Sequence, residues 1–301
     1  MTEQRNINGD NDTSFRSEGN RAQHRPTMRI DAHQHFWRYH PVTHDWINAE
    51  MTAIRKDFLP ADLAPVLARN SIEGCVAVQA DQSEQETDFL LALAKENTFI
   101  KGVVGWIDLR SQDIEERLAH YKQNRHLKGF RHILQGEEPG FMLQPDFLKG
   151  ISLLNDHGFS YDVLIFPQHL EAALQLVRHF PQQRFVIDHL AKPGIKDHLI
   201  DEWKKGIGAI AEHPNVYCKV SGMVTEADWQ NWKPADLYPY LDVVTEAFGT
   251  GRLIYGSDWP VCLVAASYDE MIAPVKEYYA SFSASEQQKI FGANAMDFYH
   301  L

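Results

Sequence analysis

The chain has 301 residues, of which 44% are hydrophobic and 23% are charged, and its formal net charge is −12 at pH 7. This composition is ordinary for a globular protein, and the acidic balance argues against a nucleic-acid partner because phosphate binding needs a basic surface. A bilayer-spanning helix needs roughly 20 consecutive apolar residues. The sequence has no such run, which excludes that kind of membrane protein.

The first segment, residues 1–27, is polar and rich in Asn, Arg, Gln and Gly. It lacks the apolar central region of a secretory signal, and its acidic residues, among them Asp10 and Asp12, disfavour a transit peptide. We therefore predict a disordered tail, followed by a single folded domain over residues 28–301. The three cysteines have no spacing typical of a disulfide framework or a metal knuckle, so we expect a reduced, cytoplasmic protein.

Strand-like and helix-like segments alternate along this domain. Short apolar runs predict strands at 28–33, 72–79, 100–108, 127–134, 159–166, 184–190, 215–222 and 253–259. Helical periodicity marks the stretches 60–69, 84–96, 112–122, 168–178, 199–212 and 235–248. Pro145-Asp146 is a further helix start, and Asn70, Gly158 and Gly249 are plausible helix ends. The alternation predicts βαβ units and a parallel sheet.

Eight such units favour a closed (β/α)8 TIM barrel. The alternative is a doubly wound open sheet, which usually has a glycine-rich phosphate turn after its first strand. Here that position holds His33-Gln34-His35-Phe36-Trp37. The following segment, 37–57, is long and aromatic for a connection between a strand and a helix, so we expect it to form a lid or a pocket wall.

Polar residues gather where the predicted strands end, which is where the active site of such a barrel lies. Residues two apart in a strand face the same side, so His33 and His35 point the same way, as a metal site or a carbonyl-binding site requires. Asp258 ends the last strand and is suited to act as a general base or a metal ligand. Two ordinary histidines, and an Asp that caps the next turn, are the alternatives.

Other predicted strands contribute further candidates. His189 follows the sixth strand, Arg131 and His132 lie in the fourth, and Lys219 lies in the seventh. An unpaired buried charge is costly, so Arg131 and Lys219 should face either a polar pocket or partners in an internal ion pair. The sequence leaves both roles open for these two cations. His189 could polarise a carbonyl or bind a metal, and a structural position at the rim is its alternative.

The combination of these residues resembles the amidohydrolase superfamily. The motifs IDAHQHFW, KGFRHILQ, VIDHLAKP, YGSDWPV and IFGANAMDFY are similar to those of its sugar-lactonase branch, which includes L-fuconolactonases and L-rhamnonolactonases. Unlike many members of the superfamily, the chain has no lysine at the tip of the fourth strand and no histidine ending the fifth. The resemblance therefore implies at most one divalent ion, such as Zn²⁺, held by His33, His35 and Asp258, and metal-independent catalysis stays open.

The resemblance implies hydrolysis of a small-molecule sugar lactone, with Asp258 activating water and His33, His35 and His189 handling the carbonyl. Cations and aromatic rings are the expected substrate contacts, namely Arg131, His132, Lys219, Trp37, Trp46 and Trp259. L-Fucono-1,5-lactone or a close relative is the favoured substrate. The alternatives are a related hydrolase or decarboxylase acting on an aromatic acid or a dicarboxylate lactone, and a non-catalytic sugar-binding barrel.

Overall fold

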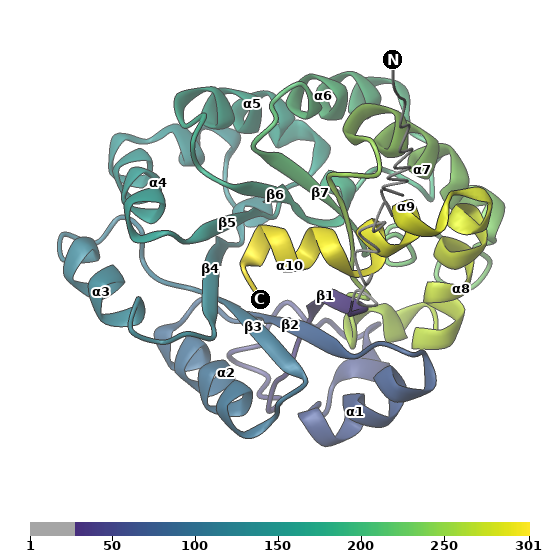
Figure 1. Ribbon diagram of the computed structural model, residues 1–301, viewed down its shortest axis with the longest axis horizontal. Coiled ribbons are helices and arrows are strands. Elements are labelled where there is room, and N and C mark those ends of the chain that lie inside the picture. The colour runs from purple at the N-terminus through teal and green to yellow at the C-terminus, as the bar shows by residue number, and fades with distance from the viewer. Residues whose placement is uncertain (1–27) are drawn as a thin grey trace, which may run out of the picture.

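Eight parallel strands surround a common axis in the computed structural model, which describes residues 28–301 (Figure 1). Each strand pairs with the next in chain order. Their bounds are β1 (Ile30–Gln34), β2 (Gly74–Val78), β3 (Ile100–Gly105), β4 (Leu127–His132), β5 (Ser160–Val163), β6 (Phe185–Ile187), β7 (Val216–Val220) and β8 (Leu253–Tyr255). The prediction of a TIM barrel is confirmed, whereas the predicted disordered tail, 1–27, lies outside the described residues.

Most of the helices form a ring outside the strands, and the last one lies across one end of the barrel (Figure 1). They are α1 (Pro60–Arg69), α2 (Glu84–Glu96), α3 (Ile114–Tyr121), α4 (Pro145–His157), α5 (Leu170–His179), α6 (Asp201–Ala211), α7 (Pro234–Phe248), α8 (Tyr268–Tyr278), α9 (Ala284–Gln288) and α10 (Asn294–Tyr299). The predicted ends at Asn70, Gly158 and Gly249 are confirmed, and Gly158 adopts the left-handed conformation that a helix end favours, with φ of 80°. Among the described residues, no helix has the length and apolar character to cross a membrane.

The barrel closes just beyond the end of β8, where the chain pairs with β1. Asp258 N donates to His33 O at 2.8 Å, and His35 N donates to Trp259 O at 2.7 Å. Strands β1 and β8 otherwise make few contacts, so these backbone bonds complete the ring at its carboxyl end. The closure thus ties together the two segments that carry the His-x-His pair and Asp258.

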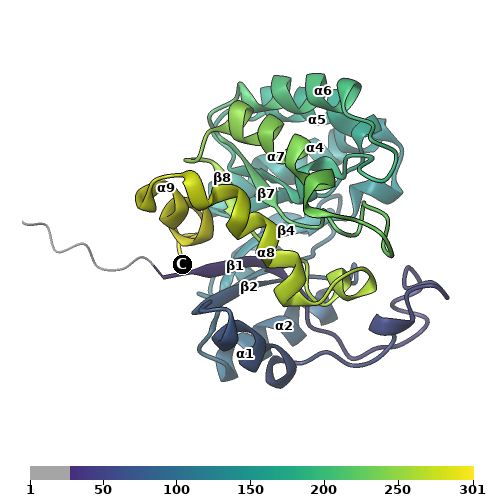
Figure 2. The same ribbon diagram turned by 90° about the vertical axis from the view of Figure 1, so that its right-hand side faces the viewer.

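Helix α10 covers the opposite, amino-terminal end of the barrel (Figure 1). Its Phe298 and Tyr299 pack with Ile30 of β1 and Val76 of β2 in a small apolar cluster inside the ring. The segment after β1 projects at the other end of the molecule (Figure 2). The barrel is therefore sealed at one end, and ligands have access to its interior from the end where the polar residues lie.

Candidate active site

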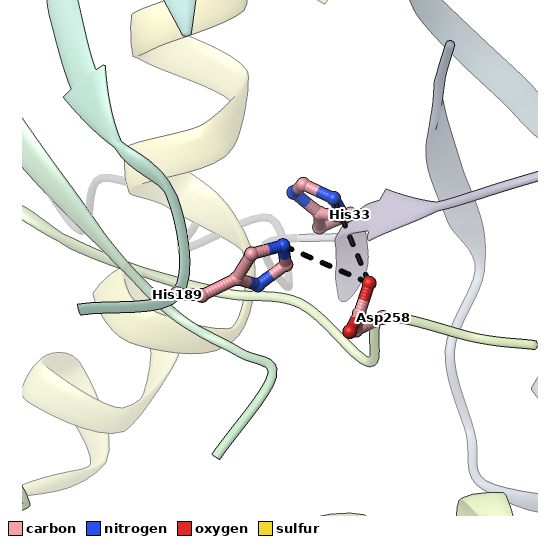
Figure 3. A group of neighbouring side chains, drawn as sticks. All are labelled: His33, His189 and Asp258. Carbon is pink, nitrogen blue, oxygen red and sulfur yellow. Dashed lines mark ion pairs between the residues drawn. The ribbon is translucent and has the colours of Figure 1, made fainter. Parts of the chain in front are cut away.

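Three side chains of metal-ligand type meet at the carboxyl end of the barrel (Figure 3). His33 lies on β1, His189 follows β6 and Asp258 follows β8. Asp258 Oδ1 lies 3.8 Å from His33 Nε2 and 3.7 Å from His189 Nε2. All three side chains are buried, so a carboxylate and two imidazoles share a space with little access to bulk water.

His35, the second histidine of the His-x-His pair, points at the same carboxylate. Its Nδ1 lies 2.8 Å from Val78 O, and its Nε2 lies 3.3 Å from Asp258 Oδ1. A carbonyl oxygen only accepts hydrogen bonds, so Nδ1 must carry the proton, and Nε2 of the neutral ring is then an acceptor. Two acceptors therefore face each other unless a positive charge lies between them, either a proton on Nε2 or a bound cation.

The group of potential metal ligands in residues 28–301 differs from the predicted set. It comprises His33, His189 and Asp258, each with a donor atom within 4.8 Å of the others. His189 belongs to this group in place of the predicted His35. The His189 ring centroid lies 4.3 Å from that of His33, and the His35 ring centroid lies 5.0 Å from it. His35 remains a neighbour of this group through its contact with Asp258.

The backbone around His189 is strained. His189, Leu190, Ala191 and Lys192 all have left-handed conformations, with φ of 52°, 55°, 58° and 50°. Each costs about 1–2 kcal/mol for a residue other than glycine, and such strain concentrates at functional sites. A Cβ on Gly222 would lie 2.6 Å from His189 Nδ1, so a glycine there leaves room for the imidazole.

Behind His33, four charged side chains form a buried network. Lys219 Nζ lies 2.5 Å from Asp162 Oδ2, 3.0 Å from Asp188 Oδ1 and 3.1 Å from His33 Nδ1. Arg131 Nη1 lies 3.2 Å from Asp188 Oδ2 and 3.3 Å from His33 Nε2. The internal ion pair is therefore the arrangement that the structure shows for Lys219, whereas Arg131 takes part in the network and also lines the cavity described below.

This environment separates the protonation states of the site residues. Burial raises the pKa of Asp258, but His189 and then His35 outweigh it and hold that pKa below its usual range. Burial lowers the pKa of His189 to about 4, and burial together with Lys219 places the pKa of His33 well below its ordinary value. At neutral pH the site thus presents an ionised carboxylate to neutral His33 and His189.

A cavity of about 460 Å³ opens above these groups. Its floor includes His35, Arg131, His189 and Asp258. Its walls come from the segment after β1 and from the loops that follow the other strands, and they include Asp45, Trp46, Asn48, Gln135, Lys192, Glu226 and Trp229. The segment predicted as a pocket wall, 37–57, supplies one side of this cavity.

Four of the predicted substrate contacts lie outside the cavity. Trp37 is fully buried, with Nε1 donating to Lys56 O, and Trp259 packs against Phe58. His132 faces Glu137, to which its Nε2 lies at 3.1 Å, and Lys219 lies beneath the floor. The structure thus places these four side chains outside the cavity lining, because nearness to a strand end does not determine which way a side chain points. Their contact with substrate stays a prediction.

The sequence patterns did not identify several residues of the site. Asp162 carries a charge inside an apolar strand, which is the same signal that identified Lys219. That signal could have predicted a buried ion pair between the two residues. Glu226 and Trp229 lie in the loop after β7, where no motif distinguishes them. Only the folded chain brings that loop next to Lys192.

The chain is similar in sequence and in structure to several known proteins. The L-fucono-1,5-lactonase of Burkholderia multivorans is 39% identical over 286 residues, which cover 91% of this chain and 96% of that protein. The L-fucono-1,5-lactonase of Burkholderia ambifaria is 36% identical, with the same coverage. A crystal structure of an amidohydrolase from Burkholderia multivorans with bound Zn has a TM-score of 0.88 and 40% identity, and it covers 91% of this chain and 99% of that one.

A protein-family model matches nearly all of the described residues. It matches residues 30–301 and is that of the amidohydrolases. The matched range contains His33, His35, His189 and Asp258, so all four converging residues lie within it. The chain belongs to the amidohydrolase family.

Proposed function

We propose that this protein is a lactonase that hydrolyses a sugar lactone to the open-chain sugar acid, with L-fucono-1,5-lactone or a close relative as substrate. The observation that carries the proposal is the Asp258 carboxylate facing His33, His35 and His189 at the floor of a cavity. The two Burkholderia relatives described above support the proposal, because both are named L-fucono-1,5-lactonases.

In the proposed reaction, Asp258 accepts a proton from water as the water oxygen attacks the lactone carbonyl. Arg131 at the cavity floor stabilises the negative charge that develops on the carbonyl oxygen. The C–O bond of the ring then breaks, and the ring oxygen takes up a proton to become a hydroxyl group. A single product that carries both the new carboxylate and the new hydroxyl group leaves the site, and one proton is released to solution at neutral pH.

The charges of the cavity favour a neutral substrate. Arg131 and Lys192 line it, but each already has a carboxylate partner, Asp188 at 3.2 Å and Glu226 at 2.8 Å. The carboxylates of Asp45, Glu226 and Asp258 line the same cavity. A dicarboxylate lactone would need cations without partners, so the polyol ring of a sugar lactone fits this site better than the aromatic or dicarboxylate alternatives.

The same residues fit a divalent metal ion. Imidazole nitrogens with one carboxylate oxygen are a ligand set that Zn²⁺ takes in catalytic sites, and the facing acceptors of His35 and Asp258 call for a positive charge. His33, His189 and Asp258 would hold the ion, with His35 beside them. When bound, such an ion would polarise the carbonyl and make a water molecule more acidic.

Metal binding is tested on the purified protein by mass spectrometry and by calorimetric titration of the metal-free chain with zinc. We expect about one zinc per chain, and weaker binding in a His189→Asn variant, since that variant lacks the imidazole ligand. Binding of equal strength in wild type and variant would contradict the assignment of His189. Complete lack of binding, with turnover unaffected by a chelator, would establish a metal-independent site.

The proposed activity is tested with a panel of lactones and a pH indicator, which reports the proton released by each ring opening. We expect turnover of one or more six-membered sugar lactones, with L-fucono-1,5-lactone among the best. Turnover of an aromatic or dicarboxylate lactone alone would favour the alternative hydrolase. Tight binding of sugar lactones without any proton release would favour a binding protein.

A further inference from the structure

Lys192 and Glu226 form an ion pair in the cavity wall, and the reaction proposed at Asp258 assigns no role to it. Lys192 Nζ lies 2.8 Å from Glu226 Oε1, and both side chains are mostly buried, with 16% and 19% of their surface exposed. Both line the cavity above Asp258. A pair at this place faces the cavity, where it can meet a ligand that enters.

The position of the pair is fixed by its surroundings. Lys192 ends the left-handed turn that begins at His189, and its backbone N donates to His189 O at 2.7 Å. Its ammonium group also lies over the Phe166 ring, 5.6 Å from the centroid. The loop of Glu226 is tied to the same region, since Glu226 O accepts from Lys196 N at 3.0 Å. The two charged groups are thus held in place before a ligand arrives.

Hydrogen-bonding capacity remains on both groups. Their mutual contact is the one side-chain hydrogen bond that either makes within residues 28–301. An ammonium has three donors and a carboxylate two acceptor oxygens, so Lys192 and Glu226 together offer a free donor beside a free acceptor. Two neighbouring hydroxyl groups match this arrangement, because one accepts while the other donates, and hydrogen bonds to charged groups are the strong ones.

A flat surface completes this part of the cavity. Trp229 lies in the same loop as Glu226, and its Nε1 donates to Thr225 O at 2.8 Å. Trp46 also lines the cavity, and its Nε1 donates to Ala80 O at 3.2 Å. With both N–H groups engaged, the rings are oriented and offer apolar surface to the cavity. The C–H face of a sugar ring can pack there while its hydroxyl groups reach the ion pair.

We propose that Lys192 and Glu226 bind two adjacent hydroxyl groups of the substrate and so determine the preference of this enzyme for hydroxylated lactones. The inference rests on the proposed lactonase function and extends it to the part of the substrate away from the reacting carbonyl. Neither residue takes part in the proton transfer that Asp258 performs. The pair selects the substrate through contacts that a lactone without hydroxyl groups cannot make.

The test compares two substrates, the sugar lactone that wild type prefers and δ-valerolactone, a six-membered lactone without hydroxyl groups. For Glu226→Gln and Lys192→Met we expect kcat/KM for the sugar lactone to fall about ten- to a hundredfold relative to kcat/KM for δ-valerolactone, mainly through KM. Lys192→Arg keeps the charge and the donors, so it should retain most of the wild-type ratio. Epimeric lactones that lack the matching pair of hydroxyls should respond less to Glu226→Gln.

A matched control is the exposed pair of Glu202 and Lys205 on α6, which has the same chemistry but lies on the outer surface. Glu202→Gln and Lys205→Met should leave both rates unchanged. Equal losses for both substrates in the Glu226 and Lys192 variants would show that the pair only supports the fold and would overturn the inference, as would an unchanged ratio. Failure of the proposed function is distinct, because wild type itself would then open no sugar lactone.

Discussion

Replacement of Asp258 by Asn lowers kcat by about 10²- to 10⁴-fold, the contribution expected of a positioned general base. The amide keeps the size of the carboxylate but cannot accept a proton from water near neutral pH. Because Asn retains a hydrogen-bonding oxygen and the backbone bond from residue 258 to His33 O is unaffected, the barrel should close as before. Initial rates with the preferred sugar lactone, measured by the pH indicator, give the effect.

Two measurements separate loss of the base from loss of structure. Circular dichroism and thermal unfolding of Asp258→Asn should stay close to those of wild type. Asp108→Asn is the matched control, because Asp108 is an exposed acid that follows β3, outside the cavity, and it accepts from Arg110 N through an oxygen that Asn also has. A rate for Asp258→Asn within a few-fold of wild type would refute the proposed mechanism.

The sequence predicted the barrel because its signals are local. Pro60 and Asn70 mark the ends of α1, and the apolar run at 72–79 surrounds β2, whose five residues are all buried. Helix α9 was not predicted, since its five residues, Ala284–Gln288, bury no side chain and so leave no periodic pattern. Helix α8 was missed as well, and it contains Pro274, which normally counts against a helix interior.

The site could be predicted only in part, because it depends on contacts between segments that are far apart in sequence. His33, Asp258 and His189 end strands that are far apart in sequence, and the topology of a parallel barrel alone is sufficient to bring such ends together. The role of Lys219 depended on Asp162 and Asp188, whose nearness follows from the register between strands. Likewise, the contact of Lys192 with Glu226 joins two loops, and loop conformation is not encoded in strand and helix patterns.

Lys219→Met is expected to have the largest effect on stability. Lys219 is fully buried and lies within 3.0 Å of both Asp162 and Asp188. Removing one partner of a buried ion pair leaves charge without compensation, which costs about 3–5 kcal/mol of the free energy of unfolding. For a domain of this size the midpoint of thermal unfolding should fall by roughly 10 °C. Urea unfolding followed by tryptophan fluorescence measures the loss.

The loss of stability in Lys219→Met should depend on pH. Burial, opposed by Lys219, raises the pKa of Asp162 to about 6, and without the ammonium that pKa rises further. The folded variant then binds a proton that the unfolded chain, with an ordinary Asp, does not bind near neutral pH. Its stability therefore falls as pH rises, so the deficit relative to wild type should be smaller at pH 5.5 than at pH 8.

A double variant identifies the source of the cost. Adding Asp162→Asn to Lys219→Met removes one of the two carboxylates that lost a partner, while Tyr299 OH, which donates to Asp162 Oδ2 at 2.8 Å, keeps an acceptor. Asp188 retains Arg131, so the double variant should regain about half of the lost stability. Lys205→Met, on the exposed surface of α6, should stay within about 0.5 kcal/mol of wild type. If Lys219→Met behaved like Lys205→Met, the buried network would contribute little to the fold, and the position of His33 would have to depend on its strand alone.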